Sequence, residues 1–185
     1  MEIKNKLESI NMIEELKLNK FSEKLFKKNQ KSEIGKFLDE NPAKYYAIRD
    51  KSKAGGTFKL KVEKTDIIEE TKDYDLFTIN VSSANYTENQ LIVGEIMISS
   101  DNEVNAILST NKTYSVRDAI KNPDFNIKTN IFDNKTLNNI PYFDNIYDYI
   151  ITNDLLNVIV EFALFDKKIG IKKEHIIIYE LRTHY

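Results

Sequence analysis

The chain contains no cysteine, which excludes both a disulfide framework and a thiolate metal site and leaves no thiol from which to infer a redox compartment. Its 185 residues carry a formal net charge of only −2. A balance this close to neutral argues against a broad nucleic-acid interface, because neutralising phosphates requires an excess of basic residues. Long apolar runs and the apolar core of a signal peptide are also missing, so a cytoplasmic protein without a membrane span is predicted.

Arginine is scarce as well. The sequence holds three arginines, Arg49, Arg117 and Arg182, against twenty-four lysines. Where lysine supplies nearly all the positive charge, an arginine indicates a position that needs a planar guanidinium able to donate two parallel hydrogen bonds. The three arginines are therefore candidate site residues.

The first forty residues predict helices. Apolar residues recur at steps of three and four between positions 2 and 28, which is typical of one amphipathic helix, or of two helices broken near Asn19. A further short helix is expected from Ile34 to Glu40 and ends before Pro42. Residues 1–41 are thus predicted to form a helical layer on a sheet, with an arm that binds a partner as the alternative.

The remainder, residues 42–185, is predicted to be rich in strands. Alternating or continuous apolar patterns indicate strands at 44–49, 57–62, 76–81, 89–99, 103–109, 125–132, 157–165 and 174–183. Short helices are expected at 114–120 and 143–156, and 65–72 fits either a helical turn or an extended edge. Because the connections between successive strands are short, the sheet should be mostly antiparallel. We predict a single α+β domain spanning residues 1–185.

The last two predicted strands, 157–165 and 174–183, contain charges in an otherwise apolar context. If they pair symmetrically about Gly170, Glu161 falls directly opposite Glu180. Like charges at opposed positions destabilise a ladder. Either a cation lies between the two carboxylates, one of them is protonated, or the register differs.

Two chemical interpretations of these charges remain open. Paired carboxylate oxygens are ligands that magnesium prefers, so Glu161 and Glu180 are candidate metal ligands. Arg182 lies two residues beyond Glu180, on the same strand face, and suits a phosphate or a carboxylate. The alternative is a structural ion pair between Arg182 and one of the two acids.

A basic, glycine-containing loop joins the strands at 44–49 and 57–62. Glycines allow close backbone approach, and amides, hydroxyls and ammonium groups supply the donors that a phosphate needs. The spacing is not that of a Walker A sequence, and a solvated hairpin tip explains the composition equally well. The candidate phosphate-binding residues are Lys51, Ser52, Lys53, Gly55, Gly56, Thr57, Lys59 and Lys61.

Three short segments together resemble a known family. They are similar to the ATP-grasp nucleotide-binding domain of the phosphoenolpyruvate synthase and pyruvate phosphate dikinase family. In chain order, the segments are Tyr46–Arg49 with the glycine loop and Phe58 that follow it, Val160–Ala163, and Ile178–Arg182. The resemblance covers about thirty residues. Asp50 and Thr183 depart from the family pattern, the interval between Arg49 and Glu161 is shorter, and no swivelling phosphohistidine segment is present.

The resemblance implies ATP and magnesium as cofactors. It places Arg49 and Arg182 near phosphates as the catalytic cations, and Glu161 and Glu180 near the metal. The chain is therefore predicted to be a nucleotide- and magnesium-binding protein of reduced ATP-grasp type, a phosphotransferase or ligase-like enzyme of unknown substrate. A non-catalytic interaction protein of similar fold is the first alternative, and a small nucleic-acid-binding module that uses Lys51, Lys53, Lys59 and Lys61 is the second.

Overall fold

The computed structural model describes residues 3, 6–51, 57–166 and 176–183. These residues gather into two compact units, one formed by Met1–Lys20 with Glu88–Tyr185 and the other by Phe21–Thr87. We call them unit 1 and unit 2. The predicted boundary between a helical layer and a sheet-rich body, at residues 41 and 42, therefore falls inside unit 2. That the two units act as a single domain stays a prediction.

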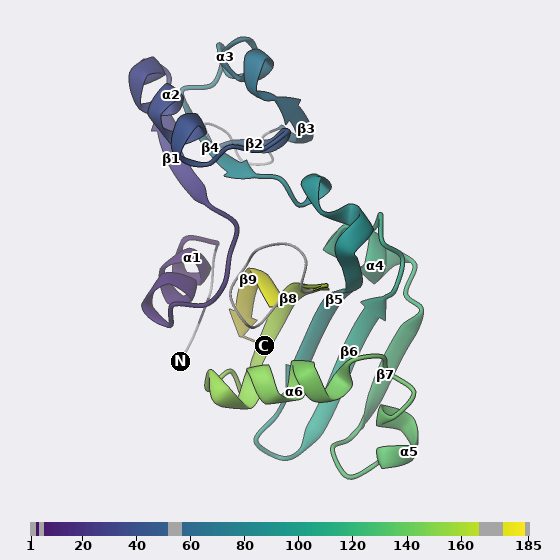
Figure 1. The fold of residues 1–185 in the computed structure, drawn as a ribbon. Coiled ribbons are helices and arrows are strands. Elements are labelled where there is room, and N and C mark those ends of the chain that lie inside the picture. Colours follow the sequence, from purple (N-terminus) through teal and green to yellow (C-terminus); the bar gives the residue numbers. More distant parts are fainter. Residues whose placement is uncertain (1–2, 4–5, 52–56, 167–175, 184–185) are drawn as a thin grey trace. The chain divides into compact units, whose positions relative to one another are not determined.

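Unit 2 is a four-stranded antiparallel sheet with two α-helices among its described residues, in the strand order β1-β4-β2-β3 (Figure 1). Its strands and α-helices are β1 (Glu23–Lys27), α2 (Lys31–Glu40), β2 (Tyr45–Asp50), β3 (Phe58–Glu63), α3 (Ile67–Glu70) and β4 (Leu76–Val81). Short 3-10 helices occupy Lys64–Asp66 and Ser83–Asn85, and a third, Thr87–Asn89, begins at the last residue of unit 2. The predicted hairpin of β2 and β3 is confirmed.

The strand β1 corrects the prediction of helix up to residue 28. Five residues of this segment pair with β4, about fifty positions away in sequence. Phe26 enters the core at 1% exposure while Leu25 is 54% exposed, which is the alternation of a strand. The helical spacing of Phe21 and Leu25 was misleading, because tertiary pairing with a distant strand overrides local propensity.

Unit 1 is a five-stranded antiparallel sheet in the order β7-β6-β5-β8-β9. Its elements are α1 (Lys6–Glu15), β5 (Gln90–Ile98), β6 (Glu103–Ser109), α4 (Val116–Lys121), β7 (Phe125–Asn130), α5 (Asn134–Leu137), α6 (Phe143–Thr152), β8 (Val158–Phe165) and β9 (Ile176–Thr183). Every strand pair among the described residues is antiparallel, so the predicted α+β class with a mostly antiparallel sheet is confirmed.

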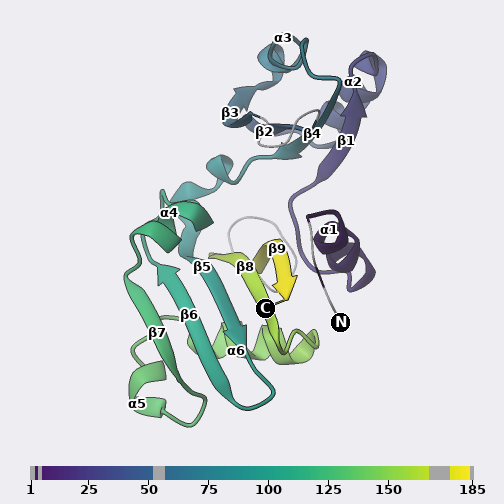
Figure 2. The same ribbon diagram turned by 180° about the vertical axis from the view of Figure 1, so that it is seen from behind.

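One face of the sheet in unit 1 is covered by α6. The helix turns Phe143, Ile146 and Ile150 inward at helical spacing, and these side chains join the core cluster with Phe162 and Ile96 from the strands. Figure 1 shows α6 lying across the sheet, and Figure 2 shows the sheet from the side away from it. The strand face that bears the cluster is therefore closed by α6, and the other face carries Glu95 and Glu161 beside the buried Val93 and Ala163.

The outer edge of β9 is covered by the N-terminal segment. The Leu181 amide donates to the buried Ser9 hydroxyl at 2.8 Å, and the Ile178 amide donates to the carbonyl of Asn19 at 2.8 Å. The Ile3 amide donates to Oγ1 of Thr183 at 3.0 Å. These bonds satisfy edge groups that would otherwise be available to another strand.

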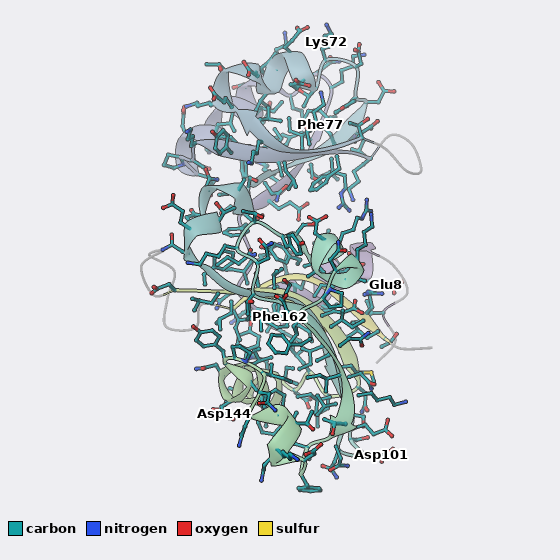
Figure 3. All side chains as sticks on the ribbon, turned by 90° about the vertical axis from the view of Figure 1, so that its right-hand side faces the viewer. Glu8, Lys72, Phe77, Asp101, Asp144 and Phe162 are labelled. Carbon is teal, nitrogen blue, oxygen red and sulfur yellow. The ribbon has the colours of Figure 1, made fainter. Side chains whose placement is uncertain are left out.

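Side chains in the cores separate cleanly from those at the surface (Figure 3). Phe77 in unit 2 and Phe162 in unit 1 are buried, whereas Lys72, Asp101 and Asp144 are exposed. Among the described residues, no helix is long and apolar enough to cross a membrane. The cytoplasmic location stays a prediction.

Three aspartates in unit 1 accept several hydrogen bonds each. Asp124 accepts from the Thr110 amide at 2.7 Å, from the Ser109 hydroxyl at 2.8 Å and from the Thr110 hydroxyl at 3.0 Å. These bonds, the Thr110 amide first, lower the pKa of Asp124 below its ordinary value. Hydrogen bonds likewise lower the pKa of Asp118 and of Asp133.

We therefore expect the protein to lose stability in acid through these groups. A carboxyl whose folded pKa is depressed contributes stability above its unfolded pKa, 3.8 for Asp124, and loses it as the pH falls through the folded value. Urea unfolding of wild type and Asp124→Asn should give a gap in unfolding free energy at neutral pH that narrows as the pH falls below 3.8. A gap that stays constant across this range would contradict the assignment.

Candidate functional site

The first candidate site is the sheet face of unit 2 that carries Arg49. Leu25, Thr78, Arg49 and Phe58 are cross-strand neighbours and form one row over β1, β4, β2 and β3. Residues adjacent to this row, Phe26, Phe77 and Ile48, are in the core of the unit. Because strand side chains alternate between faces, the row lies on the opposite face of the sheet.

Arg49 and Phe58 contact each other on this face. The guanidinium carbon of Arg49 lies 4.8 Å from the centroid of the Phe58 ring, a cation–π distance. Phe58 and Leu25 remain 47% and 54% exposed. Between them, the hydroxyl of Thr78 is buried and makes no hydrogen bond. A buried hydroxyl without a partner is energetically unfavourable, so the row combines a cation, exposed apolar surface and an unused polar group.

The predicted phosphate-binding residues fall into two groups. Ser52, Lys53, Gly55 and Gly56 lie outside the described residues. Of the others, Lys51 is anchored through its amide, which donates to the carbonyl of Leu76 at 2.7 Å, and Thr57 accepts from the Asp50 amide at 2.9 Å. The strand termini at which the loop begins and ends are therefore fixed by backbone hydrogen bonds.

Lys59 and Lys61 differ in their surroundings. Lys59 is the cross-strand neighbour of the core residue Ile48, on the face away from Arg49, and its ammonium group donates to the carboxylate of Glu70. This hydrogen bond raises the pKa of Lys59 above its ordinary value, against the opposing effect of burial. Lys61 is exposed. Lys59 thus has an acidic partner of its own, while a phosphate role for either lysine stays a prediction.

The second candidate site is in unit 1, on the face away from α6. The predicted pairing of Glu161 of β8 with Glu180 of β9 is confirmed, although the register shifts between Glu161 and Phe162. Glu95 of β5 lies opposite Glu161 on its other side. Their neighbours Ile96, Val160 and Leu181 belong to the core cluster, which places the three carboxylates in one row on the other face.

Arg182 is the cation of this row. Its Nη2 donates to Oε2 of Glu95 at 2.5 Å and lies 3.0 Å from Oε1 of Glu161. The side chains of Glu95 and Glu161 are 18% and 20% exposed, and that of Arg182 is 40% exposed. An ion pair between Arg182 and Glu161, which the sequence left open as one of two alternatives, is therefore present, with Glu95 as a second acid.

No group of three or more acids or histidines that could hold a metal ion is found within the described part of the chain. Glu161 and Glu180 are adjacent, as a shared metal would need, but the guanidinium of Arg182 already lies on Glu161. In this arrangement the residues do not form a ready metal site. Their role as metal ligands stays a prediction.

Sequence reasoning missed Glu95, although a signal was present. Gln90–Ile98 is apolar apart from Gln90, Gly94 and Glu95, so Glu95 is the single charge within a strand that is otherwise largely buried. The same pattern identified Glu161. A lone acid in a central strand needs a partner, and here the partner lies two strands away.

No protein-family model matches the chain, and no curated protein does. Similar solved structures are ATP-grasp enzymes. They include the macrocyclase MdnC from Microcystis aeruginosa, with 12% identity and a TM-score of 0.49, and a D-alanine-D-alanine ligase from Helicobacter pylori, with 10% identity and a TM-score of 0.47. Each match covers 96% of this chain and 50% of the other.

A third similar structure is D-alanyl-alanine synthetase A from Vibrio cholerae, with 13% identity, a TM-score of 0.46, and coverage of 97% of this chain and 54% of the other. The chain thus spans about half the length of these enzymes. The particular likeness to phosphoenolpyruvate synthase and pyruvate phosphate dikinase stays a prediction.

Proposed function

We propose that this protein binds ATP together with magnesium, as a reduced ATP-grasp-like protein. The observation that carries the proposal is the row on unit 2, in which Arg49 lies over Phe58 beside the unpartnered hydroxyl of Thr78. A guanidinium suits phosphate oxygens, and the exposed apolar side chains suit a base.

The proposed roles follow from the positions of the charges. Arg49 would bind phosphate oxygens, supported by the backbone and side chains of Lys51–Thr57 and by Lys61. Lys59 would take part only after leaving Glu70, its partner in this structure. Arg182 would stabilise charge on a transferred phosphoryl group. Catalysis, as a phosphotransferase or a ligase of unknown substrate, would then rest on electrostatic stabilisation by these cations.

Binding of magnesium in unit 1 requires Arg182 to move. Glu161 and Glu180 would supply carboxylate oxygens, with Glu95 beside them, once Arg182 has left Glu161. A bound ion would then supply the positive charge that this row of acids needs. In the arrangement described here, Arg182 provides the positive charge instead.

ATP with magnesium is expected to raise the melting temperature. A ligand that binds only the folded state stabilises it by about 2.7 kcal/mol at a concentration of about 100 Kd. Arg49→Gln should reduce the rise with ATP alone, and Glu161→Gln should remove the part that depends on magnesium. Arg117→Gln, at an exposed position of α4, is the matched control and should leave the rise unchanged. No rise at millimolar ATP would contradict the proposal.

A non-catalytic interaction protein is the second candidate. It is favoured by one observation, the contact of Arg182 with both Glu95 and Glu161, which a purely structural ion pair explains without a ligand. In that case ATP causes no shift. Glu161→Gln would then change only the stability of the ligand-free protein, which differential scanning calorimetry measures directly.

A further inference from the structure

The guanidinium of Arg182 is shared between two acids from different strands. A single nitrogen, Nη2, lies 2.5 Å from Oε2 of Glu95 and 3.0 Å from Oε1 of Glu161. The two acids are cross-strand neighbours on β5 and β8, and Arg182 reaches them from β9. A positive charge thus lies where two carboxylates converge, as a bound cation would.

The row of acids needs such a charge. Glu95, Glu161 and Glu180 follow one another across three adjacent strands, and directly opposed like charges destabilise a ladder. The side chains of Glu95 and Glu161 are at most 20% exposed, so water screens their repulsion only in part. Arg182 therefore compensates a charge that the fold itself creates.

The contact does not use all the donors of Arg182. Its Nε is buried and makes no hydrogen bond. A buried donor without an acceptor is unfavourable, so an arrangement that offers this group a further oxygen would be preferred. An anionic ligand such as a phosphate group could supply that oxygen once Arg182 has turned so that its Nε is accessible, because guanidinium groups bind phosphates through two donors. Glu95 and Glu161 thus hold Arg182 in place, but they leave its Nε without a hydrogen-bond acceptor.

We propose that Arg182 is a built-in cation that occupies the place of a metal ion between Glu95 and Glu161, so that these carboxylates accept a divalent cation only after Arg182 has moved away. This inference rests on the proposed function, because that proposal is the source of the requirement for magnesium. It adds the order in which the ligands bind: an anionic ligand binds Arg182 and moves it away from Glu161 first, and the metal binds second. Magnesium alone would then bind the protein poorly.

The test is Mn²⁺ binding to the full chain without nucleotide, followed by electron paramagnetic resonance of the free ion. Arg182→Gln removes the competing charge, and it should bind Mn²⁺ at least about tenfold more tightly than wild type, as expected for loss of a unit charge close to a divalent ion. Arg182→Lys keeps the charge and should stay close to wild type. Arg117→Gln is the control for loss of an arginine elsewhere on unit 1.

A second variant secures the interpretation. Adding Glu161→Gln to Arg182→Gln should abolish the gained binding, and circular dichroism shows whether each variant is folded. Equal Mn²⁺ binding by wild type and Arg182→Gln, or no binding by a folded Arg182→Gln protein, would overturn the inference. An ATP-induced rise in melting temperature measured without metal tests the nucleotide site separately, so failure of the proposed function is distinguishable from failure of this inference.

Discussion

Replacing Gly94 with alanine is expected to lower the unfolding free energy of unit 1 by about 3 kcal/mol or more. Gly94 has a φ of +153°, and a Cβ at this position would lie 2.1 Å from the carbonyl oxygen of Ile107 and 2.9 Å from the Cα of Leu108. Both atoms belong to the backbone of β6, which pairs with β5 on one side and with β7 on the other. The neighbours therefore cannot yield without loss of strand pairing.

Gly35 provides the matched control. It lies in α2, and a Cβ built there meets nothing within 4 Å. Gly35→Ala should stabilise unit 2 by about 0.5–1 kcal/mol, because alanine loses less backbone entropy in a helix. Urea unfolding followed by circular dichroism measures both changes. An unfolding midpoint for Gly94→Ala equal to that of wild type would contradict the close contact between Gly94 and the backbone of β6.

Phe162→Ala is the second change with a large expected effect, a loss of about 3–5 kcal/mol in unfolding free energy. The Phe162 side chain has 0% exposure and belongs to the cluster between the sheet and α6. Removing the ring leaves a cavity whose lining loses its contacts, because the paired strands restrict collapse around it. Calorimetry should record the loss as a melting temperature lowered by about ten degrees or more.

Phe132→Ala tests whether this effect depends on burial rather than on the loss of any aromatic ring. Phe132 is 76% exposed, so its removal should change the unfolding free energy by less than about 0.5 kcal/mol. Comparable losses for the two variants would contradict the position of Phe162 in the core. Glu161 precedes Phe162 on β8, which makes this strand both part of the core and part of the candidate site.

The strands of both sheets were predictable because their patterns are local. The apolar run of Val158–Phe165, interrupted only by Glu161, indicated a strand, and hairpin closure about Gly170 gave the pairing of Glu161 with Glu180. The short connection between the predicted strands at 89–99 and 103–109 likewise predicted that β5 and β6 pair antiparallel. Each of these inferences depends on residues that are close in sequence.

The features that were missed depend on residues that are far apart in sequence. β1 is a strand because it pairs with β4, and no local pattern in Glu23–Lys27 carries that information. Glu95 joins the site because β5 lies beside β8, which follows from the strand order and not from either strand alone. The division into two units has the same origin, since the segment 1–20 packs with residues beyond 87.

The coverage of the β9 edge has a consequence for synthesis. The hydrogen bond between Ile3 and Thr183 joins positions 180 residues apart. Ser9 and Asn19 also form hydrogen bonds with residues of β9, which is synthesised much later. Unit 2 draws all of its strands from residues 21–87 and can fold while the ribosome is still translating the rest. Unit 1 can complete its sheet only after β9 has emerged, which makes it the later and slower part to fold. During that interval the N-terminal segment is without its partner strand.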